Sequence, residues 1–264
     1  CSSDLMTGLP ALRQQVAAKI ARSYGVQRDA DSEITITPGA TEAILCAVQA
    51  LIHPGDEAIV LDPCYDSYEP SVELAGGRCV HVPLALPDFA VDWQRLADAI
   101  TPRTRMIVLN TPHNPSGALI DGSDLERLAA LIRERDIYLL SDEVYEHLVF
   151  DGREHASVLR HEELYQRAFV ISSFGKTYHV TGWKTGYVVA TPALTAELRR
   201  VLQQGTASQE QREAAAQLLH RFASSPEPVD GAAPHQWWGL LPLSTEAALV
   251  DPEREVVALS PSRV

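Results

Sequence analysis

The chain has 264 residues, 45% of them hydrophobic, which is enough to bury the core of one globular domain and a smaller unit. Its formal net charge of -13 argues against nucleic acid or an anionic membrane as a partner, because no basic stripe is available to neutralise phosphates. No run approaches the roughly 18 apolar residues of a membrane span, and the first residues lack the pattern of a signal peptide. The four cysteines show neither a CxxC pair nor a disulfide rhythm. We therefore expect a cytoplasmic protein with reduced thiols and no metal site, and we interpret Cys64 as a small buried side chain.

Apolar residues at helical and strand spacing alternate along most of the chain. The first helix is predicted at 9–22, where Leu12, Val16 and Ile20 recur on one face after Pro10. In chain order, strands are predicted at 33–37, 58–61, 79–83, 105–109, 137–141, 170–173 and 183–191. The later helices are predicted at 43–52, 68–74, 91–100, 121–135 and from 192 past 201. This rhythm predicts an α/β fold in which a mostly parallel sheet is sandwiched between helices, with right-handed crossovers.

Polar and small residues follow the ends of several predicted strands. Candidate groups come after Thr37, Leu61, Leu109, Ser141 and Ser173. Because open parallel sheets bind ligands at the carboxyl ends of their strands, we expect these groups to share one site. The first of them, the turn at 38–42, either offers the amides of a helix start to an anion or is an ordinary turn.

A stretch rich in small residues, at 172–187, carries two lysines. Lys176 follows a predicted strand and a glycine, and Lys184 comes about two helical turns later. A primary amine can form an imine with an aldehyde, and a second ammonium can bind a phosphate. The stretch therefore suits an imine-forming lysine beside a phosphate anchor.

Five ordered motifs resemble those of the large domain of fold-type I pyridoxal-phosphate-dependent aminotransferases of class I/II. The motifs are Gly39-Ala40-Thr41-Glu42-Ala43, Asn110-Thr111-Pro112-His113-Asn114-Pro115, Asp142-Glu143-Val144-Tyr145, Ser173-Phe174-Gly175-Lys176-Thr177 and Thr181-Gly182-Trp183-Lys184-Thr185-Gly186. They are most similar to the branch that contains methionine and kynurenine aminotransferases, over roughly Met6 to Val201. The resemblance implies pyridoxal 5'-phosphate as the cofactor, amino acid and 2-oxo acid substrates, and a homodimer.

The resemblance also implies roles for single residues. Lys176 resembles the lysine that forms the Schiff base with the cofactor, and Asp142 resembles the carboxylate that keeps the pyridine nitrogen protonated. Tyr145 and Asn114 resemble the two donors to the phenolic oxygen of the cofactor. Tyr65 resembles the aromatic residue that stacks on the cofactor ring.

The phosphate of the cofactor would have four protein partners. They are the amides of Ala40 and Thr41, the hydroxyl of Ser173 and the ammonium of Lys184. We interpret His113 as a hydrogen-bonded loop histidine without a chemical role.

The implied activity is transfer of an amino group from methionine, an aromatic or a kynurenine-like amino acid to a 2-oxo acid, with ping-pong kinetics. Residues 1–201 would form the cofactor-binding large domain, and 202–264 would form a helical and then loosely structured tail in place of the usual small domain. In the family, that domain supplies an arginine for the substrate carboxylate, and neither Arg254 nor Arg263 resembles it.

Two alternatives stay open on the same cofactor. One is a carbon–sulfur β-lyase, and the other is a catalytically impaired cofactor-binding fragment that lacks the carboxylate-binding arginine. A nicotinamide-binding sheet is disfavoured, because no G-x-G-x-x-G follows the first predicted strand.

Overall fold

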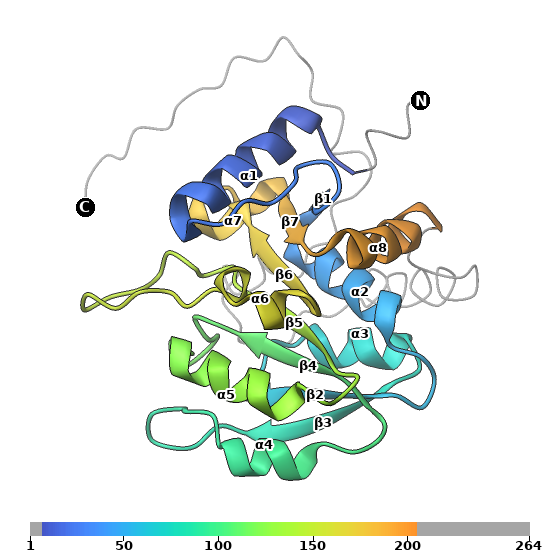
Figure 1. The fold of residues 1–264 in the computed structure, drawn as a ribbon, viewed down its shortest axis with the longest axis vertical. Helices are drawn as coiled ribbons and strands as arrows, with labels where there is room; N and C mark the ends of the chain where they lie inside the picture. Colours follow the sequence, from blue (N-terminus) through green and yellow to red (C-terminus); the bar gives the residue numbers. More distant parts are fainter. Residues whose placement is uncertain (1–6, 205–264) are drawn as a thin grey trace, which may run out of the picture. The chain divides into compact units, whose positions relative to one another are not determined.

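The computed structural model describes residues 7–204, and these contain one seven-stranded sheet (Figure 1). Its strands are β1 (Ile34–Thr37), β2 (Glu57–Asp62), β3 (Arg78–Pro83), β4 (Thr104–Asn110), β5 (Tyr138–Asp142), β6 (Ala168–Ser173) and β7 (Gly186–Val189). They lie in the order β1-β7-β6-β5-β4-β2-β3. Neighbours are parallel from β6 through β3, whereas β7 is antiparallel to both β1 and β6. The predicted α/β fold with a mostly parallel sheet is confirmed.

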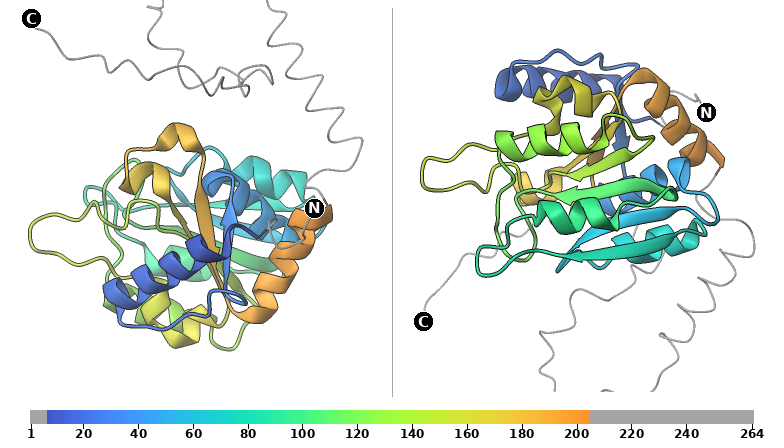
Figure 2. Two further views of the ribbon diagram at one scale, coloured as in Figure 1. Left: turned by 90° about the horizontal axis from the view of Figure 1, so that it is seen from above. Right: turned by 60° about the horizontal axis from the view of Figure 1, so that its bottom comes forward.

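Helices cover both faces of this sheet (Figure 2). They are α1 (Pro10–Tyr24), α2 (Gly39–Leu51), α3 (Tyr68–Leu74), α4 (Trp93–Ala99), α5 (Gly122–Ile132), α6 (Glu162–Tyr165), α7 (Phe174–Thr177) and α8 (Pro192–Gln204). In β2, Ala58 and Val60 enter the core beneath α2, α3 and α8, whereas Ile59 and Leu61 enter the core beneath α1, α4, α5 and α6. Because strand side chains alternate between faces, a strand buried on both sides is apolar throughout.

Two predicted boundaries are wrong, one at the start of α2 and one at the start of β7. The helix expected from residue 43 begins at Gly39, because Gly39 adopts a φ of 81° and turns the chain directly from β1 into α2. The strand expected from residue 183 begins at Gly186, because 181–183 form a 3-10 turn that ends at Lys184 in the left-handed region. Trp183 is 78% exposed in that turn, so its apolar side chain did not indicate a strand.

The reversed direction of β7 brings its first residue to the edge where the parallel strands end. Gly186 pairs with Thr37 of β1 and with Ser173 of β6. A Cβ atom on Gly186 would lie 2.7 Å from the carbonyl carbon of Gly39 and 2.8 Å from the amide nitrogen of Ala40. Only glycine fits there, and the turn into α2 therefore packs backbone to backbone against the start of β7.

No helix among residues 7–204 is long and apolar enough to cross a membrane. The predicted tail at 202–264 lies, apart from the end of α8, outside the described residues. The interpretation of Cys64 as a buried side chain is wrong, since its side chain is half-buried in the loop that follows β2 near the outer strand β3.

Candidate active site

A cavity of about 440 Å³ opens at the carboxyl edge of the sheet. Every residue that the sequence suggested for cofactor binding lines it: Ala40, Thr41, Tyr65, Asn114, Asp142, Tyr145, Ser173, Lys176 and Lys184. Asp142 and Ser173 are the last residues of β5 and β6, and the others follow β1, β2, β4, β5 or β6 or precede β7. The strand directions thus bring into one cavity side chains that are far apart in the sequence.

Asp142, the last residue of β5, is a carboxylate that is only 3% exposed. The Tyr68 hydroxyl donates to its Oδ2 at 2.8 Å, and the Val144 amide donates to its Oδ1 at 3.3 Å. Burial raises the pKa of Asp142 to about 6, although both hydrogen bonds act to lower it. No basic side chain among residues 7–204 offsets the charge of the Asp142 carboxylate. Asp142 is therefore suited to face a cationic group placed in the cavity.

The loop after β4 is held to the end of β5 by Asn110, a residue for which the sequence suggested no role. The Asn110 side-chain amide donates to the Asp142 carbonyl at 3.0 Å, and its Oδ1 accepts from the Asn114 backbone amide at 2.7 Å. These bonds fix the start of the segment that presents Asn114 to the cavity. In the same loop, buried His113 lies 2.7 Å from the Ser116 hydroxyl through Nδ1, as expected for a loop histidine, and burial lowers its pKa.

The two lysines lie on the connection between β6 and β7. Lys176 lies in α7, and its ammonium is 5.5 Å from the centre of the Tyr145 ring, at cation–π distance. Ser173 caps that helix, since its Oγ accepts from the Gly175 amide at 3.1 Å. Both lysine side chains are solvent-exposed while they line the cavity. They are accessible to a ligand that enters from solvent.

One end of the cavity combines several groups that bind anions. Ala40 and Thr41 belong to the first turn of α2, where backbone amides have no partner within the helix. Ser173 and Lys184 line the same cavity. The close contact of Gly186 with the Ala40 amide places the start of β7 against this turn. A phosphate would find amides, a hydroxyl and an ammonium here.

A buried network supports the opposite side of β6. Glu146 accepts from the hydroxyl of Ser172 at 2.8 Å, and it also contacts Lys19, Tyr24 and Tyr187. Burial alone would raise the pKa of Glu146, but the Lys19 ammonium and the hydroxyl donors bring it below its ordinary value. The network fastens α1 to the strand that ends in Ser173, and no sequence motif had indicated it.

Comparison with known proteins identifies the family. The model of the family "Aminotransferase class I and II" matches residues 5–230. The chain belongs to this family. The resemblance inferred from the five motifs is thereby confirmed, and the matched range extends beyond the boundary expected at Val201. This aminotransferase family uses pyridoxal phosphate.

Several aminotransferases are similar to this chain. Methionine aminotransferase of Escherichia coli is 52% identical over 198 residues, which cover 75% of this chain and 51% of the relative. Mouse kynurenine–oxoglutarate transaminase 1 is 38% identical over 207 residues, which cover 74% of this chain and 49% of the relative. A crystal structure of an Escherichia coli protein with methionine aminotransferase function matches with a TM-score of 0.74 at 51% identity, covering 75% of this chain and 52% of that one. The chain thus spans about half the length of these relatives.

Proposed function

We propose that the protein is a pyridoxal-phosphate-dependent aminotransferase that transfers an amino group from an amino acid to a 2-oxo acid. The observation that carries the proposal is the single cavity in which Lys176, buried Asp142 and the anion-binding groups around Lys184 meet, in a chain of this family. Methionine, aromatic and kynurenine-like amino acids are the proposed donors, because relatives named for methionine and kynurenine are among the similar proteins.

The residues of the cavity fit the chemical groups of the cofactor. Buried Asp142 has no basic partner within the described part of the chain, so a protonated ring nitrogen would complete it. The α2 amides, Ser173 and Lys184 would take the phosphate. When bound, the cofactor supplies an electron sink for negative charge at the substrate α-carbon.

The protein side of the reaction rests on a few side chains. Asp142 would keep a proton on the ring nitrogen that faces it, while Tyr68 orients the carboxylate. Tyr145 and Asn114 would donate hydrogen bonds to an anionic ring oxygen. The Lys176 amine would hold the cofactor covalently. Once the substrate amine has displaced it, the free Nζ of Lys176 would accept and donate the proton of the substrate α-carbon.

Borohydride trapping tests the lysine assignment. After addition of pyridoxal phosphate and borohydride, we expect one covalent label on the peptide that contains Lys176. Lys176→Ala should lose the label, whereas Lys184→Ala should keep it but require more cofactor. A label of unchanged yield in Lys176→Ala would contradict the assignment.

Product analysis tests the reaction. Incubation with methionine and a 2-oxo acid should yield the 2-oxo acid of methionine and a new amino acid. Release of ammonia and pyruvate from a cysteine conjugate would favour the β-lyase, and cofactor binding without any product would favour an impaired fragment. A homodimer remains a prediction from the family, to be tested by light scattering.

A further inference from the structure

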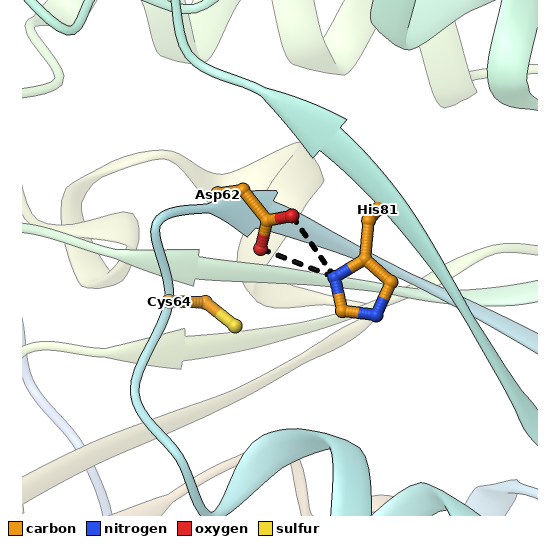
Figure 3. Close-up of side chains that lie close together, drawn as sticks. All are labelled: Asp62, Cys64 and His81. Atoms are coloured by element: carbon orange, nitrogen blue, oxygen red, sulfur yellow. Dashed lines mark hydrogen bonds and ion pairs between the residues drawn. The ribbon is translucent and has the colours of Figure 1, made fainter.

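A second cluster of chemically reactive side chains lies near the outer strand β3 (Figure 3). Asp62 ends β2, Cys64 lies in the loop that follows, and His81 lies in β3. A carboxylate oxygen, the thiol sulfur and an imidazole nitrogen all lie within 4.8 Å of one another. Figure 3 shows the carboxylate of Asp62 facing the imidazole of His81, with the Cys64 sulfur beside them. His81 Nδ1 is 3.0 and 3.1 Å from the two carboxylate oxygens.

The backbone produces this arrangement. β2 and β3 are parallel, and His81 is in register with Val60. Side chains in register share a face, as do side chains two residues apart, so Asp62 and His81 lie on the face to which Val60 points. Val60 is buried in the core beneath α3, and from α3 the Glu69 carboxylate reaches Nε2 of His81 at 3.3 Å. The cluster is therefore fixed by strand register and by the position of α3.

The donor set indicates the kind of ion. Thiolate, imidazole and carboxylate are the ligands of Zn²⁺ and related transition ions, whereas Mg²⁺ and Ca²⁺ prefer oxygen. Ligand atoms around tetrahedral Zn²⁺ lie about 3.5 Å apart, so side-chain movements of about 1 Å would bring the three ligand atoms to the separations that the ion requires. A metal-bound histidine usually donates its second ring N–H to a carboxylate, and Glu69 already stands at that nitrogen.

We propose that Asp62, Cys64 and His81 bind a divalent transition ion of the zinc type. Water would supply the fourth ligand, since the side chains of His81 and Asp62 are 38% and 35% exposed, and Glu69 would orient the imidazole. The site is separate from the proposed cofactor chemistry. It would nevertheless fasten the loop that carries Tyr65, which lines the cavity, and that leads into α3, whose first residue, Tyr68, binds Asp142.

We predicted no metal site from the sequence, because Asp62, Cys64 and His81 show none of the close spacings of cysteines and histidines that are typical of metal sites. Asp62 and Cys64 lie at the end of β2 and in the loop that follows, and His81 lies on β3. Only the pairing of β2 with β3 brings them together.

The test uses the full chain after dialysis against a chelator, without added pyridoxal phosphate. Co²⁺ is titrated as a spectroscopic probe, and Zn²⁺ binding is measured by calorimetry. We expect one ion per chain with a thiolate-to-Co²⁺ charge-transfer band. Cys64→Ser should abolish the band, His81→Gln should weaken Zn²⁺ binding at least tenfold, and Glu69→Gln should weaken it by about 10- to 100-fold.

Cys79→Ser is the matched control, because Cys79 lies on the same strand as His81 but outside the cluster. It should leave the band and the affinity unchanged. In the unsubstituted chain, Zn²⁺ should slow alkylation of Cys64 by iodoacetamide and leave that of Cys79 unaffected, which avoids any folding effect of a variant. The proposal is overturned if the parent binds no more tightly than the Cys64→Ser/His81→Gln double variant, or if Zn²⁺ protects Cys79 and not Cys64.

Discussion

Replacing Asp142 with asparagine should stabilise the cofactor-free chain at alkaline pH while weakening cofactor binding. Burial moves the pKa of Asp142 from its ordinary 3.8 to about 6, so the ionised carboxylate costs about 3 kcal/mol of folding free energy above pH 6. Asparagine carries no charge, but it has one acceptor oxygen where Tyr68 and Val144 now use two, which costs about 1 kcal/mol. The net gain at pH 8 should be about 2 kcal/mol.

The pH dependence follows from the sign of this shift. Because the folded pKa is raised, the parent has the full stabilising contribution of Asp142 below about pH 4 and loses it as the pH rises through 6. The difference between variant and parent should therefore be slightly negative near pH 4, change sign, and level off above pH 6.

Urea unfolding of the cofactor-free chain, followed by circular dichroism at pH 4.5 and at pH 8, measures the difference in unfolding free energy between variant and parent at each pH. Asp88→Asn, at an exposed carboxylate, serves as the control and should show no such change. Titration with pyridoxal phosphate should show weaker binding by Asp142→Asn at pH 8. A variant that loses the same stability at both pH values would refute the reasoning, because the charge of Asp142 would then not be destabilising.

Three further outcomes are expected. Gly186→Ala should lower stability by about 1–3 kcal/mol in thermal unfolding, because the new Cβ would meet backbone atoms. Gly182→Ala, which has open space around it, should cause no such loss, and equal losses in the two variants would contradict the packing argument. The Thr101 hydroxyl and two arginines hold the pKa of Glu57 at about 2, so Glu57 stabilises the fold above about pH 4.5 and this contribution is lost as the pH falls to 2. Glu57→Gln should therefore flatten acid unfolding below pH 4.5 and cost about 1–3 kcal/mol at pH 7, and an unchanged acid transition would contradict this. Lys184→Met should weaken pyridoxal phosphate binding about tenfold or more but leave pyridoxal binding unchanged, and equal effects on both ligands would show that Lys184 does not act on the phosphate.

Much of the site could be predicted because parallel strands make neighbours of residues that follow strand ends. Asp142, Ser173 and Asn114 come soon after apolar runs, so their shared location follows from the fold class alone. Their supporting partners could not be predicted in this way. Tyr68 and Glu146 make their contacts from α3 and from the segment after β5, and such pairings depend on how elements dock rather than on local spacing.

The direction of β7 was also beyond the residue pattern. Its apolar run, Gly186–Val189, is the same for either direction, and the expected start at Trp183 included an exposed turn. The connection from Ser173 contains no long apolar helix, and this was the available signal, because the crossover between parallel neighbours usually contains one.

The antiparallel pairing of β6 with β7 has a consequence for engineering. Ser173 and Gly186 are paired, so the connection that carries Lys176 and Lys184 is a closed loop anchored at both ends to adjacent strands. Its Lys184 end also lies against the turn at Gly39 that begins α2. Inserting or deleting residues between Lys176 and Thr181 would therefore change the spacing between the amine and the anion anchor, while the paired ends and the contact with α2 hold the sheet in register.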